Sequence, residues 1–179
     1  MEKNCKRFNS FVAAFNSCYN QDVRVVITKP AVALTNAWLA GFTDAGGYFT
    51  VSIVDRPVFK NQYQVHARFI LAQKDAEKEL KALSVLLNGK VSFQKSYGGH
   101  SLSVQLTYLK VVLRYFRLFP LKTIKRVALI KFLAIYKQLL ETMTNKKPFS
   151  PDELRVVKKR AKEINKIENL VEDKVRSIK

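Results

Sequence analysis

The chain has 179 residues, 47% of them hydrophobic, which is enough for one domain with a substantial core. It carries 32 Lys and Arg against 14 Asp and Glu, a net charge of +18. A chain this basic favours a polyanionic partner, with a solvated basic surface as the alternative. No apolar run approaches the ~20 residues that a membrane-spanning helix needs, so we expect no membrane partner.

The two cysteines and two histidines do not follow the spacing of a zinc site. Cys5 and Cys18 lie together near the N-terminus, whereas His66 and His100 are isolated from each other. We therefore expect reduced thiols and no resident metal or other cofactor. The histidines are better explained as surface or base-contacting residues.

Residues 1–34 are interpreted as a basic N-terminal extension or linker. Aromatic residues recur there at helical spacing and predict one short helix: Phe8, Phe11, Phe15 and Tyr19. The segment fits a transit peptide only loosely because it contains acidic residues, so a targeting role and a simple tether both stay open.

A short apolar helix followed by a strand is predicted for residues 35–55. Thr35 or Asn36 is the expected N-cap, and the pair Gly46-Gly47 is expected to end the helix through a positive φ. Gly41 costs a helix about 1 kcal/mol relative to alanine, which predicts that another backbone packs closely there. Alternation of apolar and polar residues then predicts a strand over 48–55.

The remaining elements follow from periodicity and turn residues. Asp75 is the expected N-cap of a helix that stops at Asn88-Gly89. Ser150 and Glu153 match a capping box at the start of the last helix. The predicted strands and helices cover 63–73, 75–87, 90–96, 101–107, 108–118, 123–142 and 150–165. Residues 166–179 are interpreted as the end of the last helix or a basic tail.

The segment 39–47, Leu-Ala-Gly-Phe-Thr-Asp-Ala-Gly-Gly, resembles the signature of the LAGLIDADG homing endonucleases. The resemblance covers about residues 35–165 and implies one nucleic-acid-binding domain of the α+β class. It implies the αββαββα order, with a four-stranded antiparallel sheet and extra C-terminal helices. Family members pair two such helices, from two subunits or two halves of one chain. The implied helix-pair interface is Trp38, Leu39, Gly41, Phe42 and Asp44.

The family's metal-binding residue is the last acid of the motif, and Gly46 occupies that position here. The resemblance matches Lys125 and, less closely, Gln73 to a lysine and a polar residue beside the metal. It gives Asp44 the role of capping and holding the helix pair. The catalytic site is therefore expected to be degenerate, at Gly46, Asp44, Gln73 and Lys125. Mg²⁺ would be held only if an active partner half restored the site.

One face of the predicted sheet carries side chains that reach base edges in a groove, although a plain solvated face would have the same alternation. The resemblance favours nucleic-acid binding by this face, with basic residues at the phosphates. The expected contact residues are Thr50, Ser52, Arg56, Gln64, His66, Arg68, Ser92, Gln94, Lys95, Ser103, Gln105, Lys122, Lys125 and Arg126.

Three functions fit these observations. The favoured one is a cleavage-inactive relative retained as an RNA-binding maturase or component of an organellar RNA–protein particle, such as the mitochondrial ribosome. The second is a site-specific DNA endonuclease, as a homodimer or paired with an active half, inactivated at Gly46. The third is a scaffold that binds protein. Structured RNA is thus the expected partner, duplex DNA the alternative, and a mitochondrion or other organelle the expected location.

Overall fold

The computed structural model describes residues 2–24, 32–59 and 61–166, with the side chains of 2–7 left aside. The chain divides into two units, Met1–Ala31 and Val32–Lys179, and each is described by itself. The tail predicted over 166–179 lies almost entirely outside the described residues. Along the described residues, the structure contains no helix that is long and apolar enough to cross a membrane.

The N-terminal unit consists of helix α1, Glu2–Tyr19, which confirms the helix predicted from the aromatic spacing. Phe11, Phe15 and Tyr19 stack along one exposed face, with successive ring centroids 6.4 and 4.8 Å apart. The Asn16 amide closes the helix end by donating to the Val23 carbonyl oxygen and accepting from the Val23 N–H. Cys18 is an exposed free thiol.

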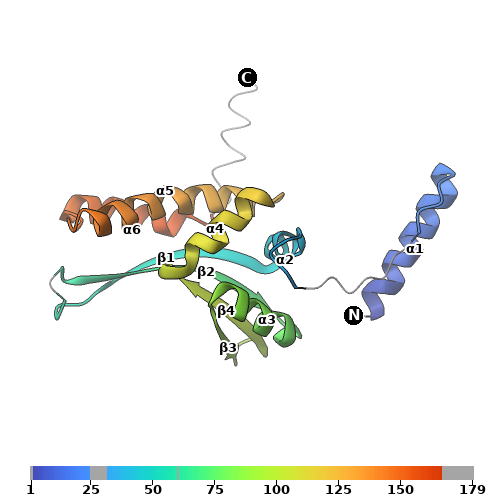
Figure 1. Cartoon of the computed structure of the whole chain (residues 1–179), viewed down its shortest axis with the longest axis horizontal. Helices are drawn as coiled ribbons and strands as arrows, with labels where there is room; N and C mark the ends of the chain where they lie inside the picture. The colour runs from blue at the N-terminus through green and yellow to red at the C-terminus, as the bar shows by residue number, and fades with distance from the viewer. Residues whose placement is uncertain (1, 25–31, 60, 167–179) are drawn as a thin grey trace, which may run out of the picture. The chain divides into compact units, whose positions relative to one another are not determined.

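The second unit is built on an antiparallel sheet of four strands in the order β1-β2-β4-β3 (Figure 1). The strands are β1 (Gly47–Asp55), β2 (Tyr63–Gln73), β3 (Lys90–Gln94) and β4 (Gly99–Gln105). Helix α3, Glu77–Leu87, connects β2 to β3. This arrangement confirms the predicted α+β class and the four-stranded sheet.

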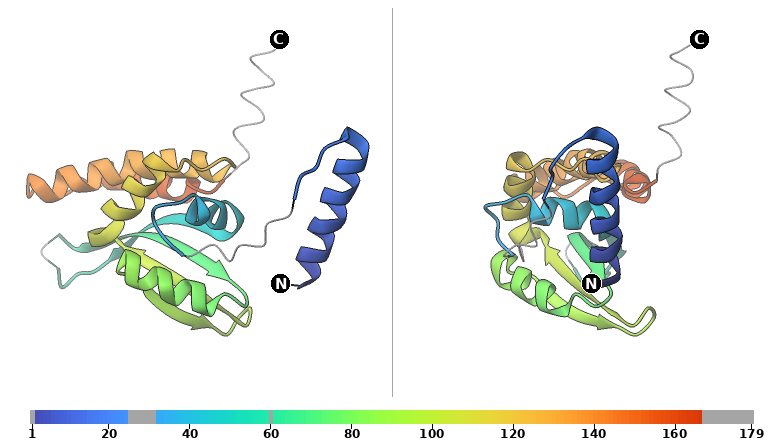
Figure 2. Two further views of the ribbon diagram at one scale, coloured as in Figure 1. Left: turned by 45° about the vertical axis from the view of Figure 1, so that its right-hand side comes forward. Right: turned by 90° about the vertical axis from the view of Figure 1, so that its right-hand side faces the viewer.

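The helices of this unit are α2 (Trp38–Gly46), α4 (Leu109–Leu118), α5 (Lys125–Thr144) and α6 (Pro151–Glu163), with a 3₁₀ turn, η1, at Leu106–Tyr108. Figures 1 and 2 show α5 and α6 side by side over strands β1 and β2. Helix α2 runs directly into β1, so the position of the signature segment is set by the sheet.

A cluster of phenylalanines forms the centre of the core between the sheet and the helices. Phe49 of β1 pairs with Phe69 of β2, and their ring centroids lie 5.4 Å apart. The Phe49 ring also lies 5.3 Å from Phe132 of α5 and 6.0 Å, edge to face, from Phe116 of α4. Because side chains alternate along a strand, these residues leave the other face of the sheet to polar side chains.

Hydrogen bonds from α4 fix the start of α2. The buried Tyr115 hydroxyl donates to the Asn36 carbonyl oxygen at 2.7 Å and accepts from the Ala40 N–H at 3.0 Å. The Asn36 side chain accepts from the Trp38 N–H, as expected of a capping residue, although the N-cap position itself is Ala37. The helix start is therefore held partly by a residue 75 positions away in the sequence.

Two predicted helix boundaries were wrong. Asp75 does not cap α3; it has a φ of 58°, and Ala76 stands at the N-cap. Gly46 and Gly47 do not end α2 through a positive φ, since Gly47 is extended at φ −86°. Glycine is needed at 47 for space, because a Cβ atom there would lie 2.5 Å from the Thr43 methyl carbon.

The predicted ends of the last strand and the last helix were also too long. Strand β4 stops at Gln105, and residues 106–108 turn into η1 so that the chain can enter α4. Helix α6 ends at Glu163, although Ile164 beyond it is still buried in the core. The apolar pattern continues to Ile164, one residue beyond the end of α6, so the pattern alone does not show where the helix ends.

Candidate nucleic-acid interface

The polar face of the sheet brings together the polar strand residues that the sequence singled out. Cross-strand register places Thr50, Arg68 and Gln105 in one row across β1, β2 and β4. A second row pairs Ser52 with His66. Gln64 lies further along the same face of β2, and Ser103 lies two residues before Gln105 on β4. This polar face is named here by its residues: Thr50, Ser52, Gln64, His66, Arg68, Ser92, Gln94, Ser101, Ser103 and Gln105.

Hydrogen bonds preorganise the β3–β4 side of the polar face. The Gln94 amide donates to the hydroxyl oxygens of Ser92 and Ser101 at 2.9 and 3.0 Å, and the two hydroxyls lie 3.2 Å apart. Ser101 was missed by the sequence reasoning, although it shares the alternation of Ser103 and Gln105 and could have been found from it. Because its amide nitrogen is occupied, Gln94 offers its carbonyl oxygen to a ligand.

Arg68 lies at the centre of the polar face with an incomplete set of hydrogen bonds. Its Nε atom is buried and has no hydrogen-bond partner in the protein, while the side chain as a whole is half-buried. An unpaired buried donor costs about 1–3 kcal/mol, so such a group is best explained by a partner that completes it. The guanidinium fork fits phosphate oxygens or the O6 and N7 acceptors of guanine.

Apart from Arg68, the predicted basic contacts lie around the polar face and not on it. Arg56 is exposed in the turn between β1 and β2, and Lys95 is exposed in the turn between β3 and β4, at the opposite end of the sheet. Lys122, Lys125 and Arg126 cluster where α5 begins. These five cationic residues therefore surround a central set of hydrogen-bonding groups, among which Arg68 carries a charge.

Two residues of the predicted degenerate centre, Gly46 and Gln73, lie together at the end of α2. A Cβ atom at Gly46 would lie 3.1 Å from Oε1 of Gln73 and 2.9 Å from the Ala72 carbonyl oxygen. Gly46 and Gln73 are thus neighbours across the sheet end. The groups available at this point are a neutral amide and a backbone carbonyl, with no acid from residue 46.

The Asp44 carboxylate is engaged in hydrogen bonds within its own chain. Oδ2 accepts from the Lys122 N–H at 2.9 Å, and Oδ1 accepts from the Thr123 N–H and hydroxyl at 3.2 and 2.6 Å. Asp44 therefore caps the approach to α5 within its own chain, and this same contact brings α2 close to the segment that carries Lys125.

The residues at this centre do not fit Mg²⁺, which is held in proteins through carboxylates and other hard oxygen ligands. Asp44 is committed to three hydrogen bonds, and Gly46 supplies no side chain. Across the described part of the chain, no three His, Cys, Asp or Glu side chains gather into a possible metal site.

The outer face of α2 is open, but one residue assigned to it was wrong. Leu39 is fully buried in the core of its own unit, so it does not reach a second helix. Gly41 is exposed, and a Cβ atom added there would meet nothing within 4 Å. Trp38 and Phe42 stack beside it, with ring centroids 4.7 Å apart, and remain partly exposed. The described residues leave room at Gly41 for the close approach that its sequence position predicts.

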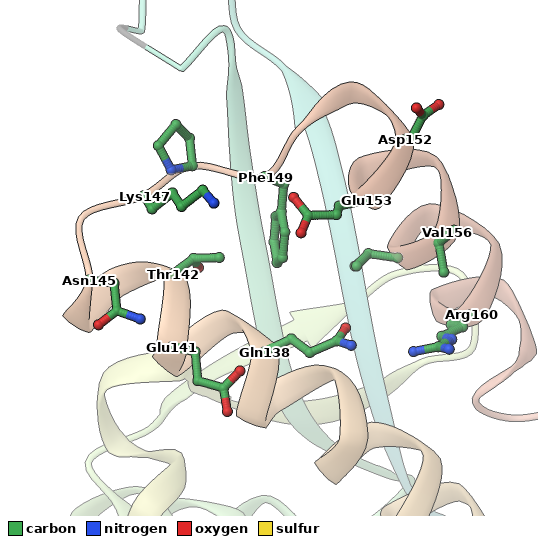
Figure 3. A pocket seen from close by; sticks show the side chains of 12 residues that line it. Gln138, Glu141, Thr142, Asn145, Lys147, Phe149, Asp152, Glu153, Val156 and Arg160 are labelled. Carbon is green, nitrogen blue, oxygen red and sulfur yellow. The ribbon is translucent and has the colours of Figure 1, made fainter.

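A separate hollow of about 500 Å³ lies between α5, α6 and the loop that joins them. Figure 3 shows Gln138 of α5 and Glu153 and Arg160 of α6 pointing into it, with the Phe149 ring between the two helices. The Gln138 Oε1 atom is buried there without a partner in the protein. Charges of both signs line this hollow, in contrast to the basic surroundings of the polar face.

Comparison with known proteins identifies the class. The family profile described as LAGLIDADG endonuclease matches residues 39–136. The match covers more than half of the chain, so this protein belongs to the LAGLIDADG endonuclease family. The signature segment 39–47 forms nearly all of α2 and the first residue of β1.

Individual relatives agree with this assignment. The chain is 35% identical over 161 residues to "Probable intron-encoded endonuclease 4" of Neurospora crassa; the match covers 90% of this chain and 29% of the relative. Its fold resembles the homing endonuclease I-TnaI with a TM-score of 0.61 and 26% identity, covering 79% of this chain and 96% of that one. It resembles I-LtrWI, solved bound to target DNA, with a TM-score of 0.62 and 23% identity, covering 81% of this chain and 47% of that one.

The chain thus corresponds to nearly the whole of one family structure and to about half of another. It spans less than a third of the curated relative.

Proposed function

We propose that this chain is a nucleic-acid-binding half of a LAGLIDADG unit that does not cleave by itself. The observation that carries the proposal is Gly46, which stands at the metal-binding position of a motif whose other parts are structurally intact. The neighbouring acid, Asp44, accepts three hydrogen bonds from residues 122 and 123. Binding groups are therefore present on the sheet, while the charged ligand that cleavage requires is missing.

Duplex DNA is the partner that the polar face fits best. An antiparallel ribbon of hydrogen-bonding side chains enters the wide major groove of B-form DNA, whereas the major groove of A-form RNA is deep and narrow. Arg68 and Gln105, adjacent in one row, have the reach for guanine and adenine edges. The relative I-LtrWI, of similar fold, was solved bound to target DNA.

Structured RNA, the partner favoured by sequence reasoning, is the second candidate. It is supported by the net charge of +18 together with the absent acid at position 46. A protein that binds RNA without cutting it keeps the basic residues that contact phosphates and does not need the metal-binding carboxylate. A maturase or an organellar RNA–protein particle, such as the mitochondrial ribosome, is the setting for this candidate. The similarity to an intron-encoded endonuclease is compatible with a mitochondrial location, whether the chain binds DNA or RNA.

The open face of α2 is proposed to pair with a second LAGLIDADG helix. Gly41 leaves space for a backbone to approach, and Trp38 and Phe42 supply apolar surface beside it. The second helix would come from a like chain or from another part of a longer protein. An acid on that second helix is the route by which Mg²⁺ chemistry would return to the assembly.

Binding is tested with labelled duplex DNA libraries and structured RNA in competition, at several salt concentrations. We expect selected duplexes to win over RNA, and affinity to fall with salt in proportion to the phosphates contacted. Arg68→Ala should weaken binding about tenfold, because a bidentate base contact contributes about 1–3 kcal/mol. Lys78→Ala, on the exposed surface of α3, is the control that removes a charge without touching the polar face. Preference for RNA would transfer the proposal to the second candidate, and binding insensitive to salt and to Arg68 would overturn both.

Cleavage is tested separately, with Gly46→Asp and Gly46→Ala compared in the presence and absence of Mg²⁺. Any side chain at 46 must displace the Ala72 carbonyl or the Gln73 side chain, so Gly46→Ala reports the steric cost alone. We expect Mg²⁺ to raise the melting temperature of Gly46→Asp and not of Gly46→Ala, with no nicking by the unmodified chain. Mg²⁺-dependent nicking by the purified unmodified chain would overturn the non-cleaving part of the proposal.

A further inference from the structure

A groove between α4 and α5 combines an apolar floor with a cationic rim. The hollow has a volume of about 620 Å³. Leu113 of α4 and Tyr136, Leu140 and Met143 of α5 form the floor, and we call this hollow the α4–α5 groove. It belongs to the helices that cover the apolar face of the sheet, so nucleic acid on the polar face does not explain it.

The floor of the groove includes two exposed aliphatic side chains. Met143 is 61% exposed and Leu140 is 41% exposed. A neighbouring hollow of about 640 Å³ shares Leu106 and Met143 with the groove and extends it toward Phe149. Contiguous apolar surface of this kind, rimmed by polar groups, marks an interaction site more often than isolated exposed residues do.

The rim of the groove is charged with one sign only. Lys110, Arg114 and Arg117 of α4 recur at i, i+4 and i+7, so their side chains lie along one face of the helix. Lys146 adds a fourth cation in the adjoining hollow, and neither lining contains an acid among the residues described. The hollow between α5 and α6 differs, because Glu141, Asp152 and Glu153 line it together with its cations (Figure 3).

We propose that the α4–α5 groove binds an amphipathic, acidic α-helix of a partner protein. Apolar side chains at i, i+3, i+4 and i+7 of such a helix would enter the groove, and carboxylates on its flanks would pair with α4. The α5 residues that line the groove run from Tyr136 to Met143, about 10 Å at 1.5 Å per residue, which matches two turns of a ligand helix.

The combination of floor and rim selects this partner over a polynucleotide. Phosphates would pair with the α4 cations but would leave Leu140 and Met143 beside a charged backbone, where their apolar surface gains nothing. Carboxylates on an apolar helix satisfy both features. The α4–α5 groove itself contains no residue of the polar face, and Gln64 is the one polar-face residue that lines the adjoining hollow. A protein in the groove and a nucleic acid on the polar face could therefore be bound at once.

The test uses the full chain and a fluorescent peptide of about 18 residues, five helical turns, with leucines on one face and glutamates elsewhere. Two control peptides have the same leucines with lysines in place of glutamates, or the same composition in an order that scatters the leucines. Fluorescence anisotropy without nucleic acid should show the acidic amphipathic peptide binding at least about tenfold more tightly than either control.

Substitutions then locate the site. Arg114→Glu should weaken the acidic peptide about tenfold and improve the lysine peptide, because the charge of the rim is reversed at one position. Met143→Ser should weaken the acidic peptide without changing the preference for charge. Lys78→Glu on α3 makes the same charge change as Arg114→Glu elsewhere and should have no effect. Thermal melts and binding of duplex DNA confirm that each variant is folded.

Three results would overturn the proposal. Equal binding of the acidic and scattered peptides would show that no helical face is recognised. Failure of the acidic peptide, together with loss of binding to an RNA hairpin in Arg114→Glu, would assign the groove to RNA. Self-association of the chain that is abolished by Met143→Ser would assign it to a second copy. None of these outcomes alters the polar face, so they leave the proposed function separately testable.

Discussion

Helices α5 and α6 are neighbours in the structure, yet the two begin in different ways. Helix α6 is capped by its own residues: Glu153 N–H donates to Ser150 Oγ, and Ser150 N–H donates to Glu153 Oε2 at 2.8 Å. The turn that leads into α5 is capped by Asp44, a residue of α2 about 80 positions earlier in the sequence. One helix start is local, and the other joins two distant elements.

Within the signature segment, the residue that holds the fold together differs from the residue at the metal-binding position. The carboxylate of Asp44 lies at the positive end of α5, where a negative charge is favourable, and it ties α2 to that helix. Gly46, two residues later, contributes to no such contact. A chain can therefore lose the acid at 46 and keep the helix arrangement, because the acid that holds the fold is a different one.

The largest effect on stability is expected for Asp44→Ala. The substitution removes three hydrogen bonds and leaves the N–H groups of Lys122 and Thr123 without partners. Hydrogen bonds to charged groups and helix caps together suggest a loss of about 3 kcal/mol in the free energy of unfolding. Urea denaturation followed by circular dichroism measures it.

The control for Asp44→Ala separates the hydrogen bonds from the charge. Glu141→Gln also removes one negative charge, and among the described residues the Glu141 side chain forms no hydrogen bond or ion pair. Its backbone carbonyl oxygen accepts from the Asn145 N–H at 2.9 Å, and the substitution leaves that bond unchanged. It should cost nothing measurable. A loss for Asp44→Ala below about 0.5 kcal/mol, the range of ordinary surface substitutions, would break the contrast between the two helix starts.

Tyr115→Phe tests the opposite end of α2 and should cost about 2 kcal/mol, since it removes a buried hydroxyl that serves both Asn36 and Ala40. Burial raises the pKa of the Tyr115 hydroxyl above its usual 10, so the group stays protonated and able to donate. Tyr108→Phe, at an exposed tyrosine, is the matched control in the same urea experiment. Equal effects of the two substitutions would show that α2 is not held from α4.

The local half of this comparison could be predicted from the sequence, and the distant half could not. Ser150, Pro151 and Glu153 stand at fixed spacing, so the capping box at α6 follows from neighbouring residues alone. The alternation of strands likewise predicted the polar face, including Arg68 and Gln105. Each of these features depends on backbone geometry over a few residues.

The remaining features depend on contacts across the fold. Asp44 accepts hydrogen bonds from residues 122 and 123, and Tyr115 forms hydrogen bonds with the start of α2. Both contacts join elements that become adjacent only after folding. Leu39 was placed on the outer face because the motif resemblance says nothing about which side of a short helix meets its own core. The absence of an acid at position 46 could be read from the sequence. The lack of space for a side chain there, against the Ala72 carbonyl oxygen, could not.

Ser150→Ala should cost about 1 kcal/mol, the usual effect of removing a serine N-cap. The loss is smaller than for Asp44→Ala because it affects one helix start and connects no second element. The same urea experiment measures it, with Ser96→Ala, at an exposed position in the β3–β4 turn, as the control. A loss as large as that of Asp44→Ala would show that local and distant caps contribute equally.

The smallest effect is expected for Glu153→Gln, and it should depend on pH. Hydrogen bonds from the Ser150 backbone and then its side chain lower the pKa of the Glu153 carboxyl below its usual 4.5. A carboxyl whose pKa is lower in the folded state stabilises the fold above its unfolded pKa, and this contribution is lost as the pH falls through the folded pKa. The melting temperature of the unmodified chain should therefore exceed that of Glu153→Gln at neutral pH and converge with it below pH 4.5. If the difference in melting temperature persisted unchanged in acid, the Glu153 cap of α6 would act through its hydrogen-bond geometry and not through its charge. A negative charge at a helix start would then matter only at α5, where Asp44 supplies it from a distant part of the sequence.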